Sequence, residues 1–158
     1  MSKDRAKFLS SIYLIIQNEE GKILLQRRQG TKLWPGFLAL PAGHIDEGEE
    51  NPYLASIREA KEELGITIAE KDLTNPFVVC RRNKSLLPYF DVYFYVTDYK
   101  GQIEIKEPEK CSELVWANIK KLPKDMIDFE KEAIENHLNG IDFSTTYADN
   151  EKVLIKKS

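Results

Sequence analysis

Three glutamates lie close together near the middle of the chain, and their spacing suits the binding of a cation. Glu59, Glu62 and Glu63 are separated by three residues and by one. At about 100° per residue of α-helix, they gather on one side. Mg²⁺ takes oxygen ligands, and a cation would offset the repulsion between neighbouring carboxylates. The pattern therefore predicts a magnesium site, with a solvated acidic surface as the alternative.

The flanking residues predict the helix that would carry these carboxylates. Asn51 is a favourable N-cap, Pro52 suits the first helical position, and Gly65 suits the left-handed residue after the last turn. The helix is therefore expected to begin at residue 52 and end at residue 64. The side opposite the glutamates carries a set of residues expected to pack against a core: Tyr53, Ile57, Ala60 and Leu64.

The segment before this helix is expected to be a glycine-containing loop. Leu40 to His44 leads from an apolar run into a turn, and Asp46 to Gly48 gives a second break. A strand, a glycine-bearing loop and an acidic helix in succession are typical of a cradle for phosphate and metal. Gly43 is therefore a candidate substrate-binding residue.

The stretch resembles the Nudix box of the MutT-like pyrophosphohydrolases. That pattern reads Gly, five residues, Glu, seven residues, Arg-Glu, an apolar residue, any residue, Glu-Glu, any residue, Gly and an apolar residue. Arg58 to Ile66 matches its second half in full. The first half is one residue longer: five residues separate Gly43 from Glu49, but it is Glu50 that seven residues separate from Arg58. Either Glu49 or Glu50 therefore takes the first glutamate position.

The resemblance implies the Nudix α/β/α sandwich, an α/β fold with a mixed β-sheet. It also implies Mg²⁺, with Mn²⁺ as a substitute, held by the Ala42 carbonyl, Glu59, Glu62 and Glu63. Arg58 would pair with carboxylates such as Glu62 and orient them.

The activity that the resemblance implies is cleavage of a nucleoside diphosphate linked to a further group by metal-activated water. A nucleoside triphosphate, plain or modified, is the expected substrate. The expected catalytic residues are Arg58, Glu59 and Glu62. Glu59 is the favoured base, and Glu107 and Glu109 are the alternatives from a distant loop.

Residues outside the box are the candidates for binding the rest of the substrate. Arg27 or Arg28, at the end of a predicted strand, would meet a phosphate, and Arg28 is the preferred one. Phe37, or Trp34 beside it, would stack on a base. Alternatively, the arginines are simply exposed to solvent, and the aromatic residues simply pack within the loop.

The remaining pattern predicts one domain over residues 1–158, in the order strands, helix, strands, helix. Strands are expected at Phe8 to Gln17, Lys22 to Arg28, Leu38 to Pro41, Ile66 to Ala69, Leu73 to Arg82, Tyr89 to Tyr99, Gly101 to Ile105 and Ser112 to Ala117. The first two are expected to form a hairpin, as are Leu73 to Arg82 and Tyr89 to Tyr99. A second amphipathic helix is expected at Asp125 to Leu138, and Val153 to Ile155 could add an edge strand.

Composition narrows the expected partners. The net charge of −3 argues against a nucleic-acid polymer as the partner, although not against a nucleotide. The apolar run from Ile12 to Ile16 is too short to span a membrane. Cys80 and Cys111 are expected to be free thiols, which predicts a cytoplasmic protein. A homodimer is expected only by analogy with the family.

Three functions compete on this evidence. The intact glutamates favour a Mg²⁺-dependent nucleotide pyrophosphohydrolase. The inserted residue keeps open a non-catalytic Nudix domain that senses a ligand. An isoprenyl-diphosphate isomerase of related fold would need a cysteine beside the metal site, and neither cysteine is near the box in the sequence.

Overall fold

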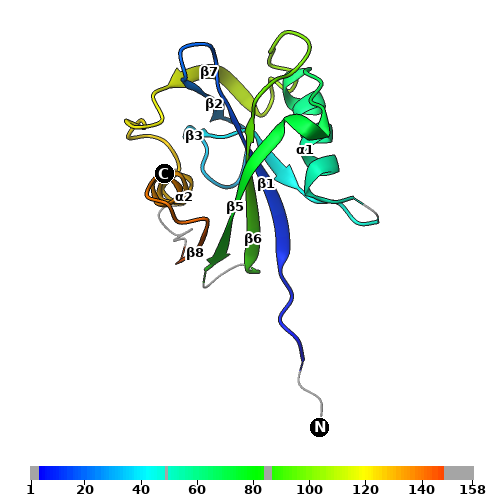
Figure 1. The fold of residues 1–158 in the computed structure, drawn as a ribbon, viewed down its shortest axis with the longest axis vertical. Coiled ribbons are helices and arrows are strands. Elements are labelled where there is room, and N and C mark those ends of the chain that lie inside the picture. The colour runs from blue at the N-terminus through cyan, green and yellow to red at the C-terminus, as the bar shows by residue number, and fades with distance from the viewer. Residues whose placement is uncertain (1–3, 49, 84–86, 148–158) are drawn as a thin grey trace.

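The computed structural model describes residues 4–48, 50–83 and 87–147 (Figure 1). Within these ranges the chain forms eight strands, two α-helices and one short 3₁₀ helix. In chain order they are β1 (Leu9–Ile16), β2 (Ile23–Arg28), β3 (Leu38–Ala39), β4 (Ala42–His44), α1 (Pro52–Leu64), η1 (Glu70–Asp72), β5 (Leu73–Arg82), β6 (Tyr89–Val96), β7 (Cys111–Ala117), α2 (Asp128–Leu138) and β8 (Phe143–Tyr147). No helix in the described part of the chain is long and apolar enough to cross a membrane.

The strands form two sheets. The larger has the order β4-β1-β6-β5-β8 and the smaller has the order β3-β2-β7. The larger sheet is mixed, because β1 runs parallel to β6 while β5 runs antiparallel to β6. The β5–β6 pairing confirms the hairpin that was predicted for these two strands.

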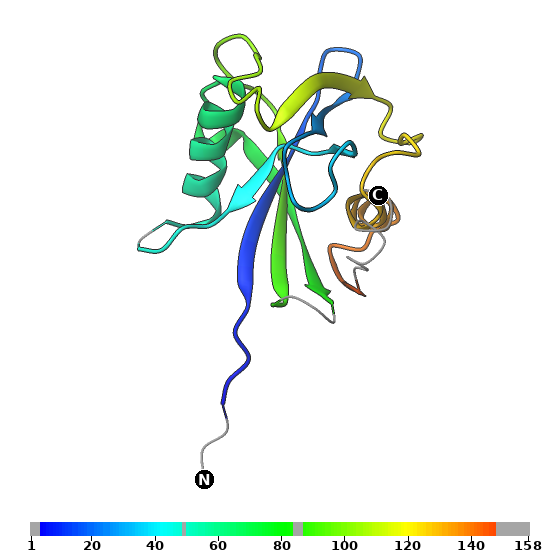
Figure 2. The ribbon, with the colours of Figure 1, turned by 180° about the vertical axis from the view of Figure 1, so that it is seen from behind.

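The two helices lie on opposite sides of the sheets, as Figures 1 and 2 show from front and back. Strand β1 serves both sides, because alternate side chains of a strand point in opposite directions. Ile12 and Leu14 pack in the cluster that contains Leu64 of α1. Tyr13 and Ile15 pack in the cluster that contains Ile134 of α2. This arrangement is the predicted α/β/α sandwich with a mixed sheet.

Helix α1 has the bounds and the caps that the sequence predicts. The Asn51 side chain accepts a hydrogen bond of 2.9 Å from the Leu54 amide, and Pro52 is the first helical residue. Gly65 ends the helix with φ 73°, and its amide donates to the Lys61 carbonyl at 3.1 Å. Only glycine adopts this left-handed conformation without steric cost.

One prediction about the chain before α1 is wrong, and another is confirmed only in part. Gly43 lies in a strand rather than in a loop, because Ala42–His44 pairs with β1. The predicted turn after β1 is present: the Asn18 amide donates to the Lys22 carbonyl at 2.9 Å, and Gln17 forms an antiparallel bridge with Ile23. The pairing does not continue into a hairpin, because β1 and β2 belong to different sheets.

Other predictions fail later in the chain. Residues 66–69 and 101–105 form no strand, although Thr67 makes an isolated antiparallel bridge with Lys100. Helix α2 begins at Asp128 rather than at residue 125, and Leu138, expected on its buried side, is 44% exposed. Strand β8 was not predicted. The expected edge strand at Val153 to Ile155 lies outside the described residues.

Candidate functional site

Two adjoining cavities flank β3 and β4. The first, which we call the acidic cavity, has a volume of about 260 Å³ and is lined by Glu63, Glu107, Lys110 and Cys111 among others. The second, which we call the aromatic cavity, has a volume of about 280 Å³ and is lined by Tyr13, Trp34, Arg81, Tyr89, Phe129 and Glu130 among others. Four residues line both, namely Arg28, Ala39, Leu40 and Ala42. The two cavities are therefore neighbours along one wall.

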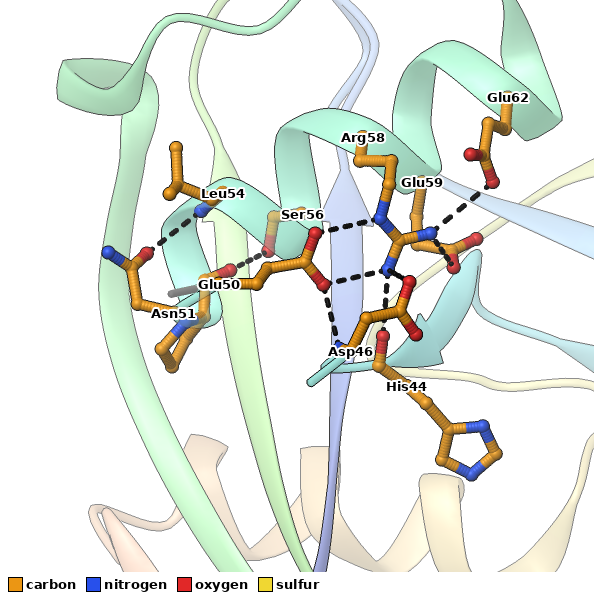
Figure 3. Close-up of polar contacts among 10 residues, drawn as sticks. His44, Asp46, Glu50, Asn51, Leu54, Ser56, Arg58, Glu59 and Glu62 are labelled. Atoms are coloured by element: carbon orange, nitrogen blue, oxygen red, sulfur yellow. Dashed lines mark hydrogen bonds and ion pairs between the residues drawn. The ribbon is translucent and has the colours of Figure 1, made fainter. Parts of the chain in front are cut away.

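Arg58 is the centre of the hydrogen-bond network on α1, as Figure 3 shows. Its Nη1 donates to Glu59 Oε1 at 2.8 Å and to Glu62 Oε2 at 3.3 Å. Its Nη2 donates to the His44 carbonyl at 2.9 Å, which ties the helix to β4. The pairing with Glu62 agrees with the prediction, and the guanidinium holds two of the three glutamates that were predicted to bind the metal.

Glu50, rather than any other described residue of the preceding loop, forms the bidentate pair with Arg58. Its two oxygens accept from Arg58 Nε at 2.8 Å and from Nη2 at 2.9 Å, and Oε1 also accepts from the Asp46 amide at 2.8 Å. The bonds from Arg58 lower the Glu50 pKa to about 2. Of the two candidates for the first box glutamate, Glu50 is therefore the one seen paired with Arg58, and Glu49 lies outside the described residues.

Gly43 is needed because Glu59 passes directly over it. A Cβ atom at this position would lie 2.2 Å from Glu59 Cδ and Oε1. The backbone of Gly43 is ordinary strand, so the requirement is for space and not for an unusual φ. Gly43 thus places the Glu59 carboxylate against β4, and burial there raises the Glu59 pKa above its ordinary value.

Glu63 is the most unusual carboxylate of the helix. Its Oε2 atom is buried and has no hydrogen-bond partner among the described residues. Burial raises the Glu63 pKa well above its ordinary value, and the negative charges of Glu59 and Glu107 raise it further. A hydrogen bond from the Ala42 backbone acts in the opposite direction. A buried acceptor in a negative environment is a position that a cation would stabilise.

The residues present fit a hard divalent cation in their chemistry. Glu59, Glu62 and Glu63 supply only oxygen, and Ala42 lies in the wall next to Glu63. As they stand, however, no three acidic, histidine or cysteine side chains of the described residues are arranged to hold an ion. Two of these carboxylates, Glu59 and Glu62, are hydrogen-bonded to Arg58, as Figure 3 shows.

The predicted substrate-binding residues occupy different environments. Arg28 lines both cavities, with Nε and Nη2 donating to the Leu33 carbonyl at 3.2 and 3.1 Å. Arg27 instead forms ion pairs with Glu113 and Asp125, so its charge is already matched.

The two aromatic candidates also differ in position. Trp34 lines the aromatic cavity, whereas Phe37 is 8% exposed and packs edge-on against Trp34 at 4.9 Å. Phe37 is not among the residues that line either cavity. A stacking role on the substrate is therefore better placed on Trp34, and Phe37 supports it from the core.

The structure brings two later residues to the acidic cavity. Glu107, one of the alternative bases, lies there with Glu63, while Glu109 is exposed and does not line it. Cys111 also lines this cavity, although it is far from the box in the sequence. Both cysteines are free, and burial raises the Cys111 pKa.

Sequence reasoning missed the residues that form the polar part of the aromatic cavity. Glu130 of α2 is 2% exposed and Arg81 of β5 is 7% exposed. A signal was present for Glu130, because it precedes Ala133 and Ile134 by three and four residues and so lies on the apolar side of the helix. A charged residue on the buried side of a helix is rare unless it is paired or has a functional role.

The family follows from the match of residues 7–137 to the model of the NUDIX domain. The chain belongs to the Nudix family. The Escherichia coli strain K12 protein described as "Uncharacterized Nudix hydrolase YfcD" is 44% identical over 55 residues, which are 34% of this chain and 31% of that protein. The match thus spans about a third of the length of this relative.

Other comparisons extend over most of the chain. A Bacillus subtilis protein described as a "Putative 8-oxo-dGTP diphosphatase" is 27% identical over 143 residues, which are 90% of this chain and 89% of that protein. The crystal structure of a MutT protein from Methanosarcina mazei has a TM-score of 0.73 at 20% identity, with 87% of this chain and 98% of that one covered. At this identity, the structural likeness establishes the Nudix fold.

Proposed function

We propose that this Nudix protein is a Mg²⁺-dependent pyrophosphohydrolase that acts on a nucleoside diphosphate linked to a further group. A nucleoside triphosphate, plain or modified, is the substrate that we favour. The observation that carries the proposal is the unpartnered, buried Oε2 atom of Glu63 in a cavity that Arg28 and Lys110 also line. The acidic cavity therefore combines carboxylates, which suit a cation, with basic residues, which suit phosphates.

The metal would be held by the Ala42 carbonyl, Glu59, Glu62 and Glu63. When bound, Mg²⁺ neutralises phosphate charge and lowers the pKa of water enough for attack on phosphorus near neutral pH. Arg58 keeps the Glu59 and Glu62 carboxylates in position through its hydrogen bonds to both. Arg28, which lines the same cavity as Glu63, would bind a phosphate oxygen.

Glu59 is the residue that we favour as the acceptor of the proton from the attacking water. Its buried carboxyl has a raised pKa, which brings its proton affinity closer to neutrality. The water oxygen forms the new bond to phosphorus, and the bond to the bridging oxygen breaks with departure of the other phosphate. Glu107 is the alternative base, since it lies in the same cavity.

The test is release of phosphate or pyrophosphate from a panel of substrates. The panel contains nucleoside triphosphates, oxidised nucleotides, ADP-ribose and dinucleoside polyphosphates, each with Mg²⁺ and with EDTA. Glu62→Gln and Glu63→Gln are compared with Glu70→Gln, which changes an exposed carboxylate outside the cavities. We expect one class to be turned over, with turnover lost in the first two variants and in EDTA. Binding without any turnover would favour a ligand-sensing domain instead.

Cys111 gives a specific reason to test isoprenyl-diphosphate isomerase activity as a second candidate. The cysteine that such a reaction would need beside the metal site is present in the acidic cavity with Glu63. Isopentenyl diphosphate is therefore added to the panel together with Cys111→Ser. Isomerisation that is lost in this variant would replace the hydrolase proposal, while unchanged nucleotide hydrolysis in Cys111→Ser would exclude a role for the thiol.

A further inference from the structure

The aromatic cavity differs from its neighbour in having flat apolar walls. Tyr13 and Trp34 both pack edge-on against Phe129, with ring centroids 6.3 Å apart in each pair. Tyr89 also lines the cavity, and its hydroxyl is 3.0 Å from His44 Nε2. These rings come from four separate segments of the chain. Aromatic walls of this kind suit a planar group better than a phosphate.

The one basic residue buried in this cavity is already neutralised. Arg81 donates from Nε to Asp91 Oδ2 at 2.6 Å and from Nη2 to Oδ1 at 3.2 Å. Its guanidinium also lies over the rings of Tyr89 and Phe129, at 4.2 and 4.3 Å from their centroids. Arg81 is thus part of the wall, and its charge is matched by Asp91 rather than offered to an anion.

Glu130 is the polar group of the wall with hydrogen-bonding capacity to spare. Its Oε1 accepts a 2.8 Å hydrogen bond from the Leu40 amide, whereas Oε2 has no hydrogen bond to the described residues. Burial raises the Glu130 pKa to about 8, against smaller opposing effects of the Leu40 amide, Arg28 and Arg81, while Asp91 raises it. A protonated carboxyl presents an O–H donor beside an acceptor oxygen.

We propose that the aromatic cavity binds the base of the nucleotide and that Glu130 is the residue that determines base specificity. Its Oε2 donates to an acceptor atom of the base, and its Oε1 accepts from a neighbouring donor. This inference rests on the proposed function, because it takes the phosphates to lie in the acidic cavity. Arg28 lines both cavities and marks the boundary between the two parts of the substrate.

The arrangement selects bases by the pattern on one edge. A donor beside an acceptor on Glu130 matches a base edge with an acceptor beside a donor, such as the amino group and ring nitrogen of adenine or the carbonyl and ring N–H of guanine. Unsubstituted purine has the same ring system for stacking but lacks the exocyclic group. A site built to bond that group should therefore discriminate against unsubstituted purine.

The test compares dATP, dGTP, the triphosphate of unsubstituted purine deoxyriboside, and inorganic tripolyphosphate. Wild type, Glu130→Gln and Glu130→Ala are assayed for kcat/KM, and calorimetry without metal measures binding of the matching monophosphates. Glutamine preserves both an acceptor for the Leu40 amide and a donor at the Oε2 position. We expect wild type to prefer dATP or dGTP over the purine analogue by about tenfold or more. The preference should persist in Glu130→Gln and disappear in Glu130→Ala.

A role of Glu130 in stability alone gives a different result. Glu130→Ala would then lower kcat/KM by the same factor for every substrate and leave the preference for dATP or dGTP unchanged. That result would overturn the inference. A preference that is absent from wild type itself, or one that Glu130→Gln abolishes, also overturns it. Failure of every nucleotide to bind or to be turned over would instead overturn the proposed function, and the inference with it.

Discussion

Glu63 on α1 and Glu130 on α2 are both acids with raised pKa values, yet their surroundings differ. Glu63 lies near Glu59 and Glu107, and its Oε2 atom has no partner among the described residues. Glu130 lies among aromatic rings, accepts from the Leu40 amide, and has Arg28 and Arg81 nearby. Glu63 therefore has negatively charged neighbours, whereas Glu130 has aromatic rings and basic residues around it.

From this contrast we infer a different role for each of the two glutamates. Several carboxylates in one cavity repel each other, and a divalent cation relieves that repulsion. A single carboxyl in an apolar cavity is instead stabilised by keeping its proton, and it then acts as a hydrogen-bond donor. We therefore assign the cation and the phosphates to the acidic cavity and the base to the aromatic cavity.

The largest expected effect comes from removing the charge of Glu63. Glu63→Gln should lower kcat/KM by about 100-fold or more, since even residues that only support a metal ligand cost 10- to 100-fold. Urea denaturation should show no loss of stability, because burial and the neighbouring negative charges disfavour the ionised carboxylate that glutamine replaces. A small loss of activity would mean that Glu63 does not hold the cation.

The pH dependence of stability distinguishes Glu130 from an ordinary glutamate. Its carboxyl binds a proton more tightly in the folded protein, with a pKa of about 8, than at its ordinary value of 4.5. This contribution to the free energy of unfolding is therefore greatest below pH 4.5 and falls as pH rises towards 8. Between pH 5.5 and 7.5 we expect a loss of about 2 kcal/mol from this group.

Urea denaturation of wild type and Glu130→Gln at both pH values isolates that loss. Glutamine does not titrate, so the variant should show a smaller decline than wild type. Glu63 contributes with the same sign in both proteins and cancels in the comparison. Equal declines would show that Glu130 is ionised in the folded protein at neutral pH.

Gly43 tests the contact between β4 and the box helix. Gly43→Ala should displace the Glu59 carboxylate, because the added Cβ would lie 2.2 Å from its atoms. We expect kcat/KM to fall about tenfold, comparable to loss of a residue that positions a ligand. The same change in a Glu59→Ala background should have little further effect, and an undiminished second loss would place the cause elsewhere.

Substitution of each arginine at the end of β2 tests which of the two contacts the substrate and which forms only structural ion pairs. Arg28→Ala should raise KM about fivefold, because one charge-assisted phosphate bond on a partly exposed side chain is lost. Arg27→Ala is the control, since its ion pairs to Glu113 and Asp125 join neighbouring segments. It should change KM little and stability by less than about 1 kcal/mol. The reverse ranking would assign the phosphate to Arg27.

Local signals made the acidic half of the site predictable. Asn51, Pro52 and Gly65 mark the ends of α1, and periodicity then places the glutamates on one side. The same signals could not show that Gly43 lies in a strand, because its pairing partner on β1 is about 30 residues earlier in the chain. They also could not choose between Glu49 and Glu50; the structure shows that Glu50 pairs with Arg58, while Glu49 lies outside the described residues.

The aromatic half of the site could not be predicted, because it is formed by contacts between segments that are distant in the sequence. Tyr13, Arg81 and Glu130 come from β1, β5 and α2, and no spacing in the sequence links them. Cys111 and Glu107 reach Glu63 in the same way, through the path of the chain into β7. In the sequence, nothing distinguished these residues from other residues of strands, loops or helices. What makes them unusual is their burial, which only the structure shows.

The most direct test of the account is the effect of Mg²⁺ on thermal stability, measured for wild type, Glu63→Gln and Glu130→Gln. A ligand that binds only the folded state at ten times its Kd adds about 1.4 kcal/mol. For a chain of this size that corresponds to a rise in Tm of about 3 to 6 °C. We predict this rise in wild type and in Glu130→Gln, and its loss in Glu63→Gln. An equal rise in Glu63→Gln would contradict the assignment of the cation to the acidic cavity.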